Sequence, residues 1–212
     1  MRYFNHNVGR ALSTAAGLAM IVSFAACGSS SSDSQSSSGN TESSSSSSAS
    51  GSVSSNGKAV VVYFSASGNT KRAAEAIAKG LDAPTFELTP QQPYTDNDLD
   101  WTQSDSRVNK EHEDESLQDV KLADTKVPDW DTYSTVYLGF PIWWMAPVWL
   151  VNDSVKSNDF AGKTIIPFCT SASSDIGNSA STLQKMAGSG TWLTGHRFSE
   201  SVSEKDVTDW LI

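Results

Sequence analysis

Residues 58–70 read KAVVVYFSASGNT, and this stretch decides the fold. Its first half is an unbroken run of apolar and β-branched residues, which is typical of a strand buried on both faces in a parallel sheet. The second half, Ser65–Thr70, is a tight polar loop, and apolar residues at helical spacing then predict a helix over 71–81. A strand, a loop and a helix in immediate succession form half of a βαβ unit.

The chain beyond this unit continues to alternate strands and helices. Further strands are expected at 85–88, 135–140, 164–169 and 191–198, and further helices at 148–155, 179–187 and 203–211. This order predicts the α/β class, with an open doubly wound sheet and helices on both of its faces. Pro167 cannot donate to a sheet ladder, so we expect it near a bulge or at the end of its strand. The acidic stretch Gln91–Asp131 is expected to mix loop with one helix.

The composition excludes one class of function. The 212 residues include 15 basic and 24 acidic residues, which gives a formal charge of −9. A chain with this balance cannot neutralise a row of phosphates, so it is not a nucleic-acid binder. We expect its partners to be neutral, cationic or presented through a basic patch.

The N-terminus has the pattern of a targeting segment. Two arginines precede the apolar run 11–26, which is shorter than the ~20 residues of a bilayer-spanning helix and is typical of a secretory signal. Ala26 and Cys27 resemble the end of a bacterial lipobox, where the chain is cut and the cysteine diacylated. Residues 1–27 are therefore predicted to be a lipoprotein signal peptide with lipidation at Cys27, which implies an extracytoplasmic protein anchored to the cell membrane by lipid. Cleavage after Ala26 by the general export pathway, which releases a secreted protein, is the alternative.

Residues 28–57 form a tract that contains 18 serines and almost no apolar side chain. Such a segment cannot offset the entropy of ordering, so it is predicted to be a disordered tether. The remaining residues, 58–212, are long enough for a single domain. This domain contains one cysteine, Cys169, so no intrachain disulfide is available to it and its stability must come from core packing.

Ligands of open α/β sheets bind beyond the carboxyl ends of the strands, where the strand order reverses. Three loops of the predicted sheet qualify, at 65–70, 141–147 and 170–175. The first loop has short hydroxyl and amide donors, a glycine that lets the backbone approach, and the free N–H groups of a helix start beside it. It consists of Ser65, Ala66, Ser67, Gly68, Asn69 and Thr70. Such a loop suits a terminal phosphate dianion without a cation. An ordinary Ser/Thr-capped helix start is the alternative.

The second loop reads PIWWMAP over residues 141–147. Adjacent tryptophans between two prolines form a stiff wall that suits stacking of a flat heteroaromatic ring. We expect Trp144 to face the ligand and Trp143 to support it, whereas Trp149 is expected in the core. The alternative is that one of the pair packs in the core and the other caps it. The third loop, TSASSD over 170–175, offers short donors and backbone amides but is a weak signal on its own.

Three motifs together carry a resemblance. SASGNT after the first strand, GFPIWW after the third and GKTIIPFCTS into the fourth resemble the flavodoxin family, and the resemblance covers 58–212. It implies a three-layer αβα sandwich whose five-stranded parallel sheet has the order 2-1-3-4-5 and binds one FMN. The first loop would then hold the ribityl phosphate, the second would line one face of the isoalloxazine and the third would contact its edge. The residues so implied are Ser65, Ala66, Ser67, Gly68, Asn69 and Thr70, then Pro141, Ile142, Trp143, Trp144 and Met145, then Thr170, Ser171, Ala172 and Ser173.

Three features depart from the family pattern. The third loop has Ala, Ser and Asp where many relatives have paired glycines, and the Asp175 carboxylate near the flavin would lower its potential. Met145 lies in the loop where many flavodoxins place a glycine beside flavin N5, and a flip of its backbone into positive φ would be costly. The third loop also has no aromatic residue. One flavin face is therefore open, or Trp101 or Tyr94 from the acidic stretch covers it.

The sequence thus predicts an FMN-binding redox protein, and the first interpretation is an electron carrier that docks a basic partner protein. The alternative is an FMN-dependent oxidoreductase that passes electrons from NAD(P)H to a quinone or other small acceptor, which an open flavin face would favour. A surface binding protein that kept the fold and lost the flavin is a third interpretation. The site loops offer no catalytic constellation of side chains. No metal site is expected either, because the run EHEDE over Glu111–Glu115 is interpreted as a solvated charge run.

Overall fold

The structure, a computed structural model, describes residues 57–212. The predicted signal peptide, the lipidation at Cys27 and nearly all of the serine tether lie outside the described residues. Within the described part, none of the helices combines the length and the hydrophobicity that crossing a membrane requires.

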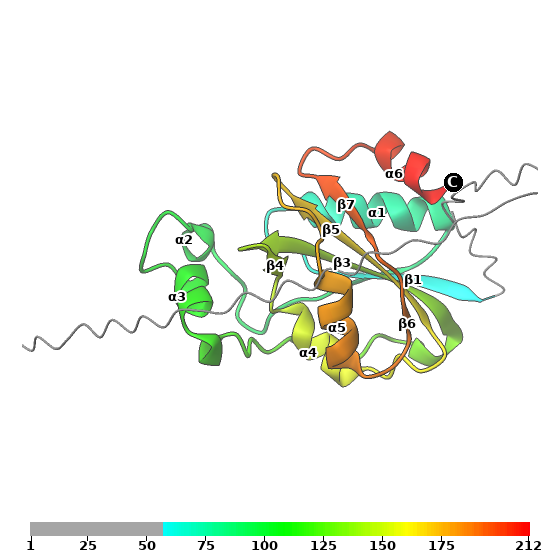
Figure 1. Ribbon diagram of the computed structural model, residues 1–212, viewed down its shortest axis with the longest axis horizontal. Coiled ribbons are helices and arrows are strands. Elements are labelled where there is room, and N and C mark those ends of the chain that lie inside the picture. The colour runs from blue at the N-terminus through cyan, green and yellow to red at the C-terminus, as the bar shows by residue number, and fades with distance from the viewer. Residues whose placement is uncertain (1–56) are drawn as a thin grey trace, which may run out of the picture. The chain divides into compact units, whose positions relative to one another are not determined.

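A parallel sheet forms the centre of the domain (Figure 1). Its strands lie in the order β2-β1-β3-β5-β6, and β7 continues the edge beside β5, whereas the short β4 pairs antiparallel with β3. With β4 set aside and with β6 and β7 taken as one interrupted strand, this is the predicted order 2-1-3-4-5. The strands are β1 (Lys58–Tyr63), β2 (Thr85–Glu87), β3 (Tyr133–Trp143), β4 (Ala146–Pro147), β5 (Thr164–Ser171), β6 (Thr191–Trp192) and β7 (His196–Ser199).

Two pairs of helices cover the sheet, one pair on each face (Figure 1). Over one face, Ile77 and Val207 of α1 and α6 join one core cluster with Phe168 of β5. Over the other face, Val155 and Leu183 of α4 and α5 join a second cluster. The predicted three-layer αβα sandwich is therefore confirmed. These helices are α1 (Asn69–Leu81), α4 (Val151–Ser157), α5 (Ser179–Ala187) and α6 (Glu204–Leu211).

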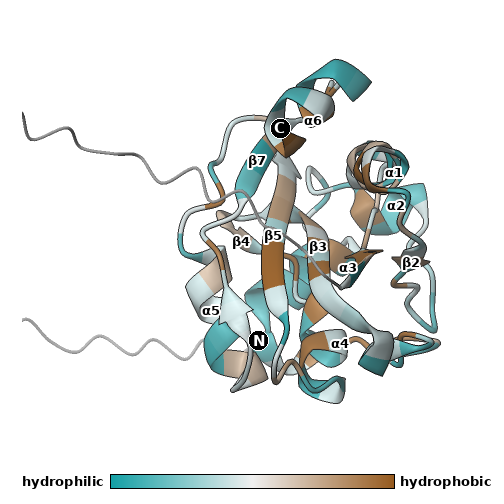
Figure 2. Cartoon of the chain, turned by 90° about the vertical axis from the view of Figure 1, so that its right-hand side faces the viewer, coloured by the Kyte–Doolittle hydropathy of each residue, from teal (hydrophilic) through white to brown (hydrophobic). Residues whose placement is uncertain are grey.

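The inner strands are apolar along most of their length because the helical layers bury both of their faces. In β5 every residue after Thr164 is buried, and Figure 2 shows this strand as a largely brown band through the molecule. In β3 the residues from Thr135 to Phe140 are buried. This is why the unbroken apolar runs in the sequence identified the strands correctly.

Pro167 lies in the middle of β5, opposite Leu138 of β3. The irregularity that accommodates it is in the edge strand. The four residues of β5 from Ile165 to Phe168 lie opposite five residues of the edge, from Trp192 to His196, so one extra residue is inserted there. The carbonyl of Pro167 faces Gly195 in this gap. Since the amide and carbonyl of one strand residue point the same way, the missing N–H also faces the gap, which agrees with the expected bulge.

The acidic stretch Gln91–Asp131 begins as a lobe, residues 91–117, beyond the carboxyl ends of the strands (Figure 1, left) and then returns to the amino end of β3. It contains two α-helices and two 3-10 helices rather than the single helix expected from the sequence. They are α2 (Asp96–Leu99), α3 (Arg107–Glu113), η1 (Glu115–Leu117) and η2 (Trp130–Thr132). Helices of four and seven residues span too few turns to show a hydrophobic period, so their caps define them instead. Thr95 forms a capping box at the start of α2, and the Ser106 hydroxyl accepts from the backbone of Asn109 at the start of α3.

Candidate functional site

The three predicted loops meet around one cavity of about 470 Å³ at the carboxyl ends of the strands. This volume lies in the range of small-molecule sites, roughly 300–1,000 Å³. The loops contribute Ala66, Ser67 and Asn69, then Pro141, Ile142, Trp143 and Trp144, then Thr170, Ser171, Ala172 and Ser173. Ser174 of the third loop and Trp101, which was considered as a cover, also line the cavity, and Leu99, Val108 and Glu200, which no motif indicated, complete the lining.

The first loop is shaped by its own polar groups. The Ser65 hydroxyl accepts a hydrogen bond from the backbone N–H of Gly68 at 3.1 Å, and Asn69 Nδ2 donates to the Ser67 hydroxyl at 3.3 Å. Gly68 has a φ of +86°, which a glycine adopts without strain. No side chain in the described part of the chain caps the first turn of α1. The N–H groups of that turn therefore remain available to an anion, at the positive end of the helix dipole.

The charge around this loop is unusual for a phosphate site. Among the described residues that line the cavity there is no Lys, Arg or His, and Glu200 is the one charged residue. The two cations in the first turn of α1 are directed elsewhere. Lys71 Nζ binds the Glu87 carboxylate at 3.0 Å, and Arg72 donates to the Glu200 carbonyl at 3.0 Å. The remaining donors are hydroxyls, one amide and backbone N–H groups, which fit a phosphate held by dipoles.

Four predicted site residues do not line the cavity, namely Ser65, Gly68, Thr70 and Met145. Ser65 and Gly68 instead fix the shape of the first loop. Thr70 is buried, and its hydroxyl shares a 2.7 Å hydrogen bond with the hydroxyl of Thr170, which joins the first loop to the third. Met145 is 84% exposed at the tip of the second loop.

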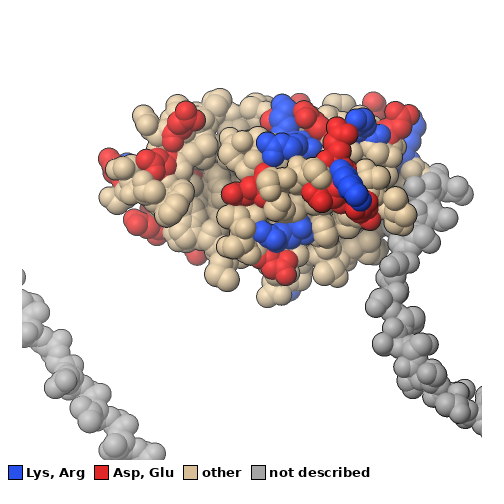
Figure 3. All heavy atoms as spheres, turned by 90° about the horizontal axis from the view of Figure 1, so that it is seen from above, with Lys and Arg blue, Asp and Glu red and all other residues tan. Residues whose placement is uncertain are grey.

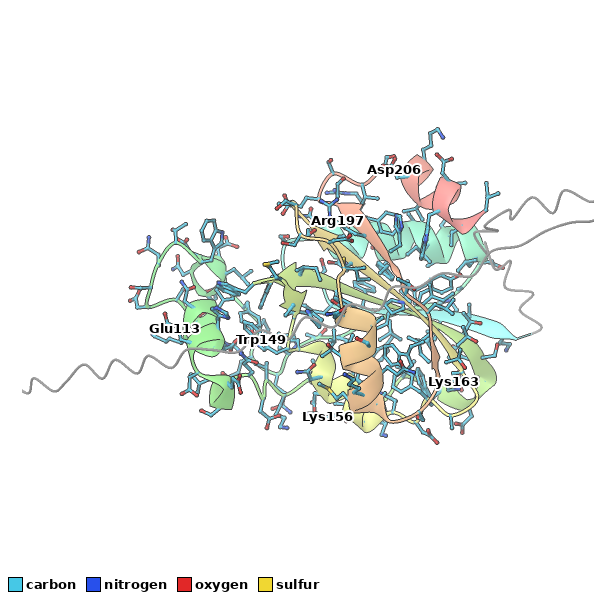
Figure 4. The ribbon with its side chains drawn as sticks, in the orientation of Figure 1. Glu113, Trp149, Lys156, Lys163, Arg197 and Asp206 are labelled. Carbon is cyan, nitrogen blue, oxygen red and sulfur yellow. The ribbon has the colours of Figure 1, made fainter. Side chains whose placement is uncertain are left out.

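The third loop is held from the neighbouring strand by Arg197, which Figure 4 labels on β7. Arg197 Nε donates to the Ser171 hydroxyl at 2.8 Å, and Nη2 donates to the carbonyls of Ser171 and Ala172, both at 2.9 Å. No motif in the sequence pointed to this arginine. Asp175, expected beside the flavin edge, does not line the cavity and accepts the N–H of Ile176 at 2.7 Å.

The second loop ends in a two-residue turn, Trp144–Met145, between β3 and β4. Trp143 pairs with Ala146 across the turn, which fixes its length. Both turn residues have positive φ, 44° for Trp144 and 64° for Met145. Turns of this kind strongly prefer Asn-Gly or Asp-Gly, so a Trp-Met pair is strained. The costly positive φ considered for Met145 is thus already present in this conformation.

The two tryptophans of the second loop both line the cavity but are anchored differently. Trp143 is half-buried, and its ring meets those of Tyr94 and Trp149 edge to face, with centroids 5.9 and 5.1 Å apart. Trp144 is 41% exposed, and its indole stacks on the imidazole of His112 at 4.1 Å with 10° between the planes. Trp149 is buried, as expected. One face of Trp144 is therefore already covered by the lobe.

The prediction of a solvated run over Glu111–Glu115 is wrong for its first residue, which is only 4% exposed. The Glu111 carboxylate accepts hydrogen bonds from Arg107 Nε at 2.6 Å, from the Tyr94 hydroxyl at 2.5 Å and from Trp149 Nε1 at 2.9 Å. In Figure 4, Trp149 lies beside the helix that carries these acidic residues. Three donors make burial of the charge possible. Burial and the adjacent Glu111 carboxylate raise the pKa of Tyr94, which keeps its hydroxyl a donor.

These observations can be compared with known proteins. The flavodoxin family model matches residues 58–212. The chain belongs to the flavodoxin family. A comparison with curated proteins finds no match.

Solved structures agree with this assignment. A protein of Bacteroides uniformis proposed to be a flavoprotein is 38% identical, with a TM-score of 0.66, over 73% of this chain and 97% of its own. A similar protein of Bacteroides eggerthii is 36% identical, with a TM-score of 0.64, over 74% and 96%. A Lactobacillus acidophilus flavoprotein in complex with FMN shares the fold at 22% identity, with a TM-score of 0.52, over 73% and 98%.

In this flavodoxin-family protein, the lobe bounds part of the cavity through Leu99, Trp101 and Val108. Of the two aromatic residues considered as a cover for the second flavin face, only Trp101 lines the cavity, whereas Tyr94 packs beside Trp143. Trp101 is 72% exposed, so it stands at the rim. Leu99 and Val108 could not be found from the sequence because no motif connects the lobe to the sheet.

Proposed function

We propose that the chain binds FMN and works as an extracytoplasmic electron carrier, anchored to the membrane through lipidated Cys27. The observation that carries the proposal is the meeting of an uncapped helix start and an indole wall at one cavity. Bound FMN would supply reversible electron uptake, and the protein would position it and tune it electrostatically.

Each loop has a distinct part in the proposed binding. Ser67, Asn69 and the first-turn N–H groups of α1 hold the phosphate, since they provide donors without a cation. The indoles of the second loop support the isoalloxazine ring. The third loop, fixed in place by Arg197, contacts the edge of the ring.

The lobe favours the carrier over the oxidoreductase. A nicotinamide or a quinone needs an open flavin face for hydride transfer, and Trp101 with its neighbours bounds the cavity on the lobe side. A carrier instead passes electrons through the exposed edge of a covered ring. The lobe is also acidic, and in the view of Figure 3 its protruding end carries red acidic groups, whereas the blue basic groups lie over the rest of the molecule. A basic redox partner fits such a surface.

The proposal is tested by titrating the full chain with FMN and with riboflavin while following flavin fluorescence. Quenching by FMN is expected, with weaker binding of riboflavin, which lacks the phosphate. Ser67→Asp places a carboxylate in the phosphate loop and should weaken FMN binding at least about 10-fold, with little effect on riboflavin. Ser181→Asp, on the exposed side of α5, is the matched control and should bind FMN as the wild type does.

The outcomes separate the candidate functions. A protein that ignores added FMN would refute both redox functions and leave the flavin-free binding protein. Reduction of bound FMN by NAD(P)H at turnover rates would favour the oxidoreductase. In an oxidoreductase the flavin face is already open, so Trp101→Ala should not increase the rate of this reduction. Release of a Cys27→Ala variant from membranes into the medium is expected if the cysteine carries the anchor.

A further inference from the structure

The strained turn at the cavity needs something that holds it. Trp144 and Met145 both adopt left-handed backbone conformations that residues with a Cβ disfavour. The pairs Trp143–Ala146 and Ile142–Pro147 fix the length of the turn, but two strand pairs at the end of a hairpin form a short ladder. Met145 is 84% exposed, so its side chain contributes little burial that could hold the turn.

The side chain of Trp144, in contrast, is held by two rings, by an offset stack on Trp149 with centroids 6.1 Å apart and by a closer stack on the lobe. Its indole lies nearly parallel to the His112 imidazole, with centroids 4.1 Å apart and 10° between the planes. The neighbouring residue, Glu111, is buried and binds Trp149 Nε1, which follows the hairpin in the chain. Consecutive residues of α3 thus contact two indoles on either side of β4, so the helix is a firm support for the stack.

We propose that His112 is a positioning residue for the flavin-contacting turn. Its stack on Trp144 keeps the turn in the left-handed arrangement that borders the cavity, although His112 itself does not line the cavity. The inference rests on the proposed function, because the cavity is taken to hold FMN. It adds that the lobe acts on the flavin through the turn as well as by covering it.

Loss of the imidazole should release the turn. With only the offset stack on Trp149 left, the Trp144 indole can leave its rotamer and the backbone can relax toward negative φ, which moves the edge of the cavity at Trp143 and Trp144. An aromatic stack of this kind corresponds to a change of about 5-fold in binding. We therefore expect His112→Ala to weaken FMN binding about 5-fold. His112→Phe keeps a flat ring and should stay within about 2-fold of the wild type.

Two readouts decide the proposal. The first is FMN titration of the full-length wild type, His112→Ala, His112→Phe and Glu113→Ala, the last being an exposed neighbour on α3 that serves as the matched control. The second uses flavin-free protein and NMR. The carbon-bound ring protons of His112 should shift upfield under the indole, and Trp144→Leu should abolish that shift. The Met145 amide and methyl signals should move in His112→Ala but not in His112→Phe.

The outcomes distinguish this inference from the proposed function. If the wild type ignores FMN, the proposed function fails, and the Met145 signals still decide whether His112 holds the turn. If the wild type binds FMN and His112→Ala binds it equally well, the positioning role is overturned. Equal weakening by His112→Ala and His112→Phe would also overturn it, because a flat ring would then be insufficient.

Discussion

Removing the Glu111 carboxylate tests how the lobe is held against the sheet. Glu111→Ala leaves the Arg107 guanidinium, the Tyr94 hydroxyl and Trp149 Nε1 without their shared acceptor. Tyr94 and Trp149 are then buried or half-buried donors that no water easily reaches. Each donor that loses its partner in such a place costs free energy, and an unpaired buried charge costs more.

The size of the loss follows from the exposure of the groups involved. Breaking a fully buried ion pair costs about 3–5 kcal/mol. The Arg107 side chain is 23% exposed and regains part of its hydration, so we expect Glu111→Ala to lower the free energy of unfolding by about 2–4 kcal/mol. Glu111→Gln keeps the shape and one acceptor oxygen, and should lose about 1–2 kcal/mol.

The assay is urea unfolding of the full chain followed by tryptophan fluorescence and by far-ultraviolet circular dichroism. Glu113→Ala, two residues along α3 and exposed, is the control and should change stability by no more than about 0.5 kcal/mol. A loss below about 1 kcal/mol for Glu111→Ala would refute the reasoning, because it would mean that water replaces the carboxylate without penalty.

Three further changes test other parts of the molecule. Thr70→Val leaves the Thr170 hydroxyl without its buried partner and should cost about 1–2 kcal/mol in the same denaturation assay, and the double valine variant should recover part of that loss. Burial lowers the pKa of His196, so as the pH falls the imidazole takes up its proton first in the unfolded chain, where its pKa is about 6.5. Stability should therefore fall as the pH drops below that value, and His196→Phe should flatten this limb of the pH profile. Burial raises the pKa of the Cys169 thiol to about 12, so a thiol reagent near neutral pH should label it only as fast as the protein unfolds.

The sheet could be predicted from the sequence because its strands are buried on both faces. Val60, Val62, Val136 and Ile165 lie within runs that carry the strand signal without any help from distant residues. The loops at the carboxyl ends could be predicted for the same reason, since strand order alone brings them to one edge. The local sequence pattern was therefore sufficient to predict the strands and the loops that follow them.

The lobe could not be predicted because its structure depends on distant partners. Glu111 has the same local sequence signature as the exposed acids beside it, and only Tyr94 and Trp149 distinguish it, by donating to its carboxylate. Trp144 likewise has no local signal for its stack on His112. Pairings across 17, 32 and 38 residues decide these environments, and periodicity does not reveal such pairings.

The charge of the cavity has a consequence for the redox chemistry that the proposed FMN would supply. With Lys71 bound to Glu87 and Arg72 bound to the Glu200 carbonyl, the phosphate would be held by dipoles and its charge would stay uncompensated by any cation lining the cavity. Any negative charge that the flavin gained on reduction would lie near that phosphate and near Glu200, which lines the cavity. At short range in a partly dehydrated site such repulsion is strong. The protein should therefore bind reduced FMN more weakly than oxidised FMN, which lowers the potential of the bound flavin and suits a donor of electrons.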